Sequence, residues 1–261
     1  MRFSRLTLMF AVLCILAAAG AAYAGNAYGH LKHAVDTNNS DPLAAKWSCD
    51  TSFDPATKLA TIEFTIDNLA QLLSTAGMVN ASWSNIAIDD DGSMIDNLQL
   101  GLDGDPVINL SFSVTAGNAG TTFHIISGLL GPLGLANADA AATAGVTVTD
   151  SLMTMNGATA NGLLGGKFYR ATYNGASTLP DLVNGPVVVP ANGTLTVSGT
   201  DPWQNVGAVN SMQSEFYFNL TASDLASGTS SFAVVPIPEP GAMLALLTGL
   251  IGFAGIARRK H

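Results

Sequence analysis

The stretch Val107-Ile-Asn-Leu-Ser-Phe-Ser-Val114 decides the fold class, because apolar and polar side chains alternate along it from Ile108 onward. An extended strand points successive side chains to opposite faces, so this pattern predicts a half-buried strand. Leu59-Ala-Thr-Ile-Glu-Phe-Thr-Ile66 alternates in the same way, with an apolar face formed by Ala60, Ile62, Phe64 and Ile66. Two such strands place the chain among proteins with a β-sheet core.

Other short segments rich in β-branched and aromatic residues are separated by Gly, Asn, Asp and Pro. These further strand candidates are Met78–Trp83, Thr121–Ser127, Gly145–Thr149, Phe168–Tyr173, Thr194–Ser198, Glu215–Thr221 and Ser231–Val235. Many short strands with turn residues between them predict an all-β fold, an antiparallel β-sandwich. Two stretches do not alternate: we expect one or two helical turns in Leu69–Ala76, and a short helix or a long loop in Leu129–Ala144.

The N-terminal segment has the order of features found in a secretory signal peptide. Arg2 and Arg5 precede an apolar run from Leu6 to Ala18, and Ala22-Tyr23-Ala24 forms a small-x-small site before Gly25. This order predicts a signal peptide over residues 1–24, removed by signal peptidase. A transmembrane anchor is the alternative.

The C-terminal segment begins with alternating prolines at 236, 238 and 240, which keep the chain extended. The sixteen residues of Ala242–Ala257 contain no charge. As a helix at 1.5 Å per residue they would measure about 24 Å, slightly less than the ~30 Å of a hydrocarbon core. The basic residues after them predict a single transmembrane helix with its C-terminal end inside. A buried core helix is the alternative.

Three consecutive parts of this tail form a recognisable signal: Pro238-Glu239-Pro240, the apolar stretch, and the basic cluster Arg258-Arg259-Lys260. In this order they resemble a PEP-CTERM sorting signal, which occurs on exported proteins of Gram-negative bacteria that make exopolysaccharide. The resemblance covers residues 236–261 and implies recognition by an exosortase, an integral-membrane transpeptidase-like enzyme. It also implies transient residence in the inner membrane through 242–257, followed by release to the cell surface or extracellular matrix. It implies where the protein is delivered, and it implies no activity.

The segment between the two ends, residues 25–235, is expected to be one extracellular domain. It retains five of the 10 Lys and Arg residues and 18 of the 19 Asp and Glu residues, a formal net charge of −13. Such a surface repels polyanions, so we expect no nucleic-acid partner. Cys49 is the only cysteine in this segment, which excludes an internal disulfide. A buried thiol is expected, and pairing with another chain is the alternative.

The strongest candidate for a metal site is the acidic stretch that begins Asp-Asp-Asp-Gly at residue 89. Calcium takes six to eight oxygen ligands, and Asp-rich turns supply them. An EF-hand loop is excluded, because Ala87 and Leu98 stand where it needs acidic ligands. A calcium site shared by two turns would use Asp89, Asp91, Asp96, Asp103 and Asp105. A solvated acidic hairpin is the alternative.

Candidate catalytic residues are few, and we expect no enzyme. Glu63 and Glu215 are the two glutamates of the domain, far apart in sequence and both expected on outward strand faces. His124 is also expected on a polar face, and no G-x-S-x-G motif accompanies it. The pair His30 and His33 lies close to the predicted cleavage site and has no further metal-binding pattern around it.

Two tryptophans have different expected roles. Trp83 alternates with apolar residues and is expected in the core. Trp203, in Asp201-Pro202-Trp203, is expected in an exposed loop where it could stack on a sugar ring. The sequence thus favours a structural or interaction protein of the exopolysaccharide matrix or biofilm. A calcium-dependent polysaccharide-binding or adhesion module is the alternative, and a secreted hydrolase is a third.

Overall fold

The computed structural model describes residues 31–35, 47–66, 78–103, 106–151 and 154–237. The expected signal peptide, the segment Leu69–Ala76 and the C-terminal helix lie outside these ranges. Within them the chain is all-β, and no helix is long and apolar enough to cross a membrane.

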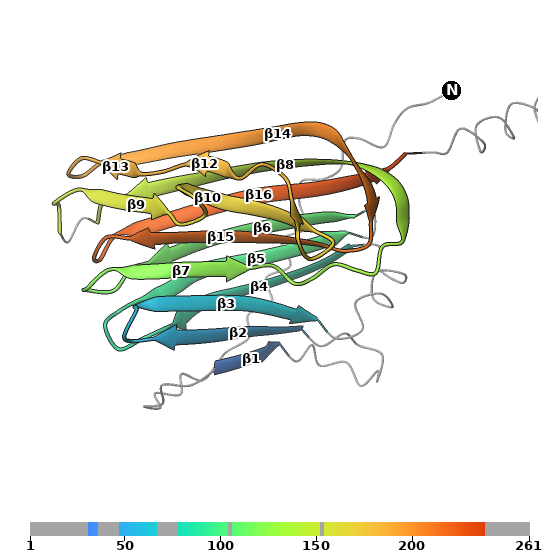
Figure 1. The fold of residues 1–261 in the computed structure, drawn as a ribbon. Helices are drawn as coiled ribbons and strands as arrows, with labels where there is room; N and C mark the ends of the chain where they lie inside the picture. Colours follow the sequence, from blue (N-terminus) through green and yellow to red (C-terminus); the bar gives the residue numbers. More distant parts are fainter. Residues whose placement is uncertain (1–30, 36–46, 67–77, 104–105, 152–153, 238–261) are drawn as a thin grey trace, which may run out of the picture.

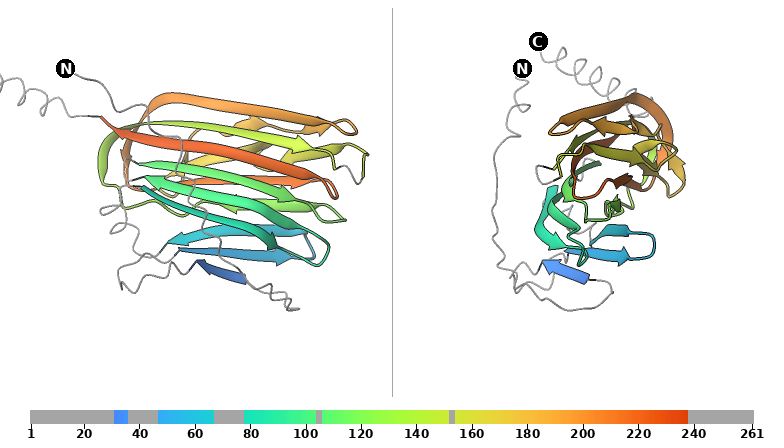
Figure 2. Two further views of the ribbon diagram at one scale, coloured as in Figure 1. Left: turned by 180° about the vertical axis from the view of Figure 1, so that it is seen from behind. Right: turned by 90° about the vertical axis from the view of Figure 1, so that its left-hand side faces the viewer.

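The strands form two sheets that lie one behind the other in Figure 1 and separate into two layers in the end-on view of Figure 2. The ten-stranded sheet contains β1 (Leu31–Val35), β2 (Trp47–Asp54), β3 (Leu59–Ile66), β7 (Thr121–Ile126), β9 (Ala158–Gly162), β10 (Lys167–Tyr173), β11 (Ser177–Thr178), β12 (Leu182–Asn184), β13 (Val187–Val189) and β15 (Met212–Leu220). The six-stranded sheet contains β4 (Met78–Ala87), β5 (Met94–Asp103), β6 (Val107–Thr115), β8 (Leu135–Thr149), β14 (Thr194–Val209) and β16 (Leu225–Pro236).

Neighbouring strands run in the order β1-β2-β3-β7-β15-β10-β11 in the larger sheet and β14-β8-β16-β6-β5-β4 in the smaller one. The prediction of an all-β, sandwich-like fold is confirmed. Its antiparallel character has an exception, because β3 and β7 pair in parallel. The chain leaves the larger sheet after β3, forms the β4–β5–β6 meander in the other sheet, and returns beside β3 in the same direction.

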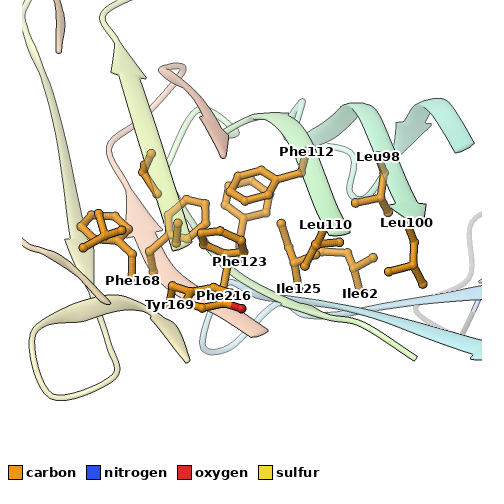
Figure 3. Close-up of a cluster of buried hydrophobic side chains, with 14 of the residues drawn as sticks. Ile62, Leu98, Leu100, Leu110, Phe112, Phe123, Ile125, Phe168, Tyr169 and Phe216 are labelled. Carbon is orange, nitrogen blue, oxygen red and sulfur yellow. The ribbon is translucent and has the colours of Figure 1, made fainter. Parts of the chain in front are cut away.

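The core lies between the two sheets and follows the alternation seen in the sequence. Ile108, Leu110, Phe112 and Val114 of β6 are all at most 2% exposed. The ring of Phe112 lies 4.9 Å from that of Phe216 and 5.6 Å from that of Phe218, centroid to centroid. Figure 3 shows Phe112 pointing from one sheet toward Phe123 and Phe216 of the other. Aromatic packing across the interface therefore joins the two sheets.

The expectation of a short helix or long loop over Leu129–Ala144 is wrong from Leu135 onward, because β8 begins there, while residues 129–134 lie in the connection between β7 and β8. Four alternate alanines of this strand, at 138, 140, 142 and 144, are at most 5% exposed. Backbone hydrogen bonding to β14 on one side and β16 on the other, together with this burial, overrides the helix propensity of alanine.

Candidate binding groove on the ten-stranded sheet

A row of mostly charged side chains from β3, β7, β15 and β10 lies across the outer face of the larger sheet. Each of these strands turns its apolar residues inward, so the alternate residues face solvent. The register places Glu63 of β3 and Glu215 of β15 on either side of Ile126 of β7, and Arg170 of β10 beside Glu215. With strands about 4.8 Å apart, the two glutamate Cα positions are about 10 Å apart. The sheet therefore joins residues from across the sequence.

Ion pairs run along this row. Arg170 donates from Nε to Asp181 Oδ1 at 2.9 Å and from Nη2 to Asp181 Oδ2 at 2.8 Å. Its Nη1 lies 3.7 Å from Glu215 Oε1. The hydrogen bonds to Asp181 raise the pKa of Arg170, and the charges of both carboxylates add to that effect. The bidentate pair fixes the plane of the guanidinium group.

The other oxygen of Glu215 contacts a histidine. Glu215 Oε2 lies 2.7 Å from His124 Nε2, and the His124 ring lies 4.6 Å from the Tyr217 ring. Side chains of both members of the pair are about one-fifth to one-quarter exposed, 21% for Glu215 and 24% for His124. Glu215 is thus held between Arg170 and His124, which orients its carboxylate on the sheet surface.

A groove of about 390 Å³ lies over this row. Its lining includes Glu63, Arg170, Gln213 and Glu215, with Ile126 as the apolar residue between the glutamates. The β10–β11 hairpin borders it with the residues Thr172, Gly175, Ala176 and Thr178. Gly175 has a φ of 74°, which a glycine adopts without strain in this turn. The volume is at the lower end of the roughly 300–1,000 Å³ of ligand pockets.

The predicted outward orientation of Glu63, His124 and Glu215 is confirmed. Their proximity, and the participation of Arg170 and Asp181, was not predicted. Glu63, His124, Arg170 and Glu215 stand at polar positions of strands, which is a readable signal, whereas Asp181 precedes β12 and belongs to no strand. Their meeting depends on strand order and register, above all on the parallel β3–β7 pair, and alternation does not encode these.

The predicted calcium ligands occupy different places. Asp89 Oδ1 accepts hydrogen bonds from the amides of Asp91 and Ser93, and its Oδ2 accepts one from Ser93 Oγ. Asp91 Oδ2 forms an ion pair with Lys58 at 2.9 Å. These contacts describe a hairpin turn closed by its own aspartates.

The remaining acidic residues lie along β5. Asp96 Oδ2 accepts a hydrogen bond from Thr115 Oγ1 at 2.9 Å. Asp103 ends the same strand, seven residues further on, which is about 23 Å at strand rise. Asp105 lies outside the described residues. Within the described ranges no three His, Cys, Asp or Glu side chains are grouped so that they could hold a metal ion.

Trp83 is 7% exposed and its ring lies 4.9 Å from that of Phe64, as expected for a core residue. Trp203 is 54% exposed, but it belongs to β14 and not to a loop. The register of β14 against β8 shifts between Asp201 and Gln204. The strand therefore continues past Pro202 through an irregularity in its pairing with β8.

Cys49 is fully buried, and burial raises its pKa to about 12. The prediction of a buried thiol is therefore confirmed. His33 lies in β1, while His30 is outside the described residues. The sorting-signal residues are outside them as well: Pro238, Glu239, Pro240, Arg258, Arg259 and Lys260.

Comparison with known proteins adds little to this geometry. No family model matches the chain, and no curated protein matches it. Among solved structures it is similar to the enzymatically active domain of tailspike protein 4 from bacteriophage CBA120, at 9% identity and a TM-score of 0.23. That alignment covers 61% of this chain and 20% of the tailspike chain. The chain thus spans about a fifth of that structure, and a similarity this low assigns neither fold nor function.

Proposed function

We propose that this chain is an exported surface or extracellular-matrix protein that interacts with exopolysaccharide through its two-sheet domain. The observation that carries the proposal is the polar groove over β3, β7, β15 and β10, whose lining contains hydroxyl, amide, guanidinium and carboxylate groups. Such groups recognise a polyhydroxylated ligand, because each sugar hydroxyl both donates and accepts. The acidic composition and the signal-peptide pattern are consistent with an exported domain.

Sorting is the second half of the proposal and rests on the C-terminal sequence. Pro238, Glu239 and Pro240 would be recognised by an exosortase while residues 242–257 hold the chain in the inner membrane. The strand β16 ends at Pro236, and Ile237 still donates its amide hydrogen to Asn137 O at 3.0 Å. The recognised motif would therefore follow the folded domain directly. Deletion of Arg258-Arg259-Lys260 should impair retention and processing, and normal surface delivery of that truncated chain would refute this half.

The binding half is tested by co-sedimentation of the full-length chain, purified in mild detergent, with the exopolysaccharide of its own host. Binding that persists in EDTA supports recognition by the groove. Binding that requires calcium would favour the alternative, a calcium-dependent adhesion module in which Asp89 and Asp91 take part. Absence of sedimentation in both conditions would refute an interaction with exopolysaccharide.

A second candidate function is favoured by one specific observation: Glu63 and Glu215 lie two strands apart and line the same groove. Inverting glycosidases place two carboxyl groups about 6.5–9.5 Å apart. However, Glu215 is engaged by Arg170 and His124, and Glu63 is exposed. Neither glutamate has the apolar surroundings typical of a general acid, so binding is the better-supported function.

A further inference from the structure

The groove contains polar groups that the protein itself leaves available. The side chains of Glu63, Thr172 and Thr178 have no hydrogen-bond partner among the described residues. By contrast, Arg170 and Glu215 are fixed by their neighbours Asp181 and His124. The groove thus combines an oriented ion pair with free acceptors and hydroxyls on its two borders. The groove therefore offers both oriented and unpaired polar groups to a ligand.

The apolar part of the groove is small. Ile126 lies in the row between Glu63 and Glu215, where its side chain offers one patch of hydrocarbon surface flanked by carboxylates. A sugar ring matches this arrangement, because its C–H face is apolar while its edge carries hydroxyl groups. A flat hydrophobic ligand would leave the Glu63 carboxylate desolvated and unpaired, which is costly.

The charges of the groove select among saccharides. The groove lining contains two carboxylates, Glu63 and Glu215, and one guanidinium group, Arg170, which Asp181 already pairs. Asp50 of β2 lies directly opposite Glu63 in the register and adds a further acidic residue beside it. The rest of the domain is also strongly acidic. An acidic saccharide would be repelled, and one that carries a protonated amine would be attracted.

We propose that this groove binds a segment of an amino-bearing saccharide, with Glu63 accepting hydrogen bonds from the ligand's ammonium group. The inference rests on the proposed interaction with exopolysaccharide and names the site and the chemical class. Glu215 and Arg170 orient the adjacent ring through its hydroxyl groups, and the hydroxyls of Thr172 and Thr178 close the border formed by the β10–β11 hairpin.

The test uses defined probes with the full-length chain in mild detergent. Binding of a glucosamine hexamer, a glucose hexamer and a galacturonic acid hexamer is measured by calorimetry at low and at physiological salt. We expect the glucosamine hexamer to bind most tightly, the galacturonic acid hexamer not to bind, and the affinity to fall with salt. Glu63→Gln keeps the shape but removes the charge, and should weaken binding of the glucosamine hexamer about tenfold, as for loss of one charge-assisted hydrogen bond.

The matched control is Asp90→Asn, which removes one carboxylate from the exposed β4–β5 turn, outside the groove. It should leave the affinity unchanged, and both variants should unfold at the temperature of the unaltered chain. Equal affinity of Glu63→Gln and the unaltered chain, equal weakening by Asp90→Asn, or preference for the galacturonic acid hexamer would overturn the proposal. If the unaltered chain shortens a hexamer and Glu63→Gln does not, the binding proposal would be overturned in favour of hydrolysis.

The experiments distinguish a wrong assignment of the binding site from a wrong proposal about the interaction with exopolysaccharide. If host exopolysaccharide co-sediments equally with the unaltered chain and with Glu63→Gln, and no hexamer binds, the groove assignment is wrong while the interaction with the matrix stands. If the host polymer fails to co-sediment with the unaltered chain, the broader function is wrong.

Discussion

Replacement of Gly228 by alanine should destabilise the domain by a predictable amount. Gly228 of β16 lies opposite Phe112 of β6, and a Cβ atom there would lie 2.5 Å from Phe112 Cζ and closer still to Cε1. Ordinary contact begins near 3.4 Å, so the ring would have to move by about 1 Å. It cannot do so freely, because the Phe216 and Phe218 rings lie against it.

The magnitude follows from two opposing effects. Overpacking of a close-packed core costs about 1–3 kcal/mol, and alanine regains about 0.5–1 kcal/mol over glycine within a strand. The net loss should be about 1–2 kcal/mol, which lowers the Tm of a domain of this size by about 2–8 °C. Thermal unfolding followed by circular dichroism measures it. Gly145→Ala is the control, because a Cβ at that position meets its nearest neighbours at 3.6 and 3.7 Å, and its Tm should not fall.

A double-mutant cycle identifies the cause. Phe112→Leu removes the ring that the added Cβ atom would strike, so Gly228→Ala should cost much less in the Phe112→Leu background than in the unaltered chain. If the two losses of stability simply add, or if Gly228→Ala and Gly145→Ala have the same Tm, the steric argument is wrong.

Three further predictions concern other parts of the domain. Because burial raises the pKa of Cys49 from 9.0 and that of Tyr169 from 10.0 to about 12 each, the folded state holds these protons more tightly than the unfolded state. The free energy of unfolding that these two groups contribute is therefore complete below pH 9 and declines toward pH 12. Urea unfolding at several pH values should show a smaller decline for Cys49→Ala than for the unaltered chain. Ellman's reagent should react with Cys49 only after unfolding. Asp89→Ala should cost about 1–3 kcal/mol in the same assay, because the carboxylate accepts three hydrogen bonds from its own turn. Trp83→Ala should cost about 3–5 kcal/mol and Trp203→Ala less than about 0.5 kcal/mol, since the first is buried and the second exposed; equal losses would contradict the assigned positions.

The sequence predicts the strands of this protein better than their arrangement. Alternation identifies β3 and β6 because large apolar residues alternate with polar ones, so the two sides of each strand differ strongly in hydrophobicity. In β8 the buried residues are alanines, so the contrast between its faces is weak and the strand resembles a helix or loop. Trp203 is missed as a strand residue because Pro202 precedes it, although a register shift accommodates the proline.

The candidate groove illustrates the same division. The polar orientation of Glu63, His124 and Glu215 follows from local alternation and is predicted. Their grouping depends on β7 lying between β3 and β15, which are separated by most of the chain. No local pattern specifies such an order, because many pairings of amphipathic strands would bury the same apolar faces.

The position of β16 also determines when the domain can form. In the smaller sheet β16 lies between β6 and β8 and pairs with both along most of its length, so its two neighbours are joined through the last described strand of the chain. β15 occupies a similar place in the larger sheet, between β7 and β10. Neither sheet is therefore complete until nearly the whole chain is available, and the long sequence separation of these pairs makes folding slow. If the chain is exported as we propose, its smaller sheet could be completed only after β16 had crossed the membrane.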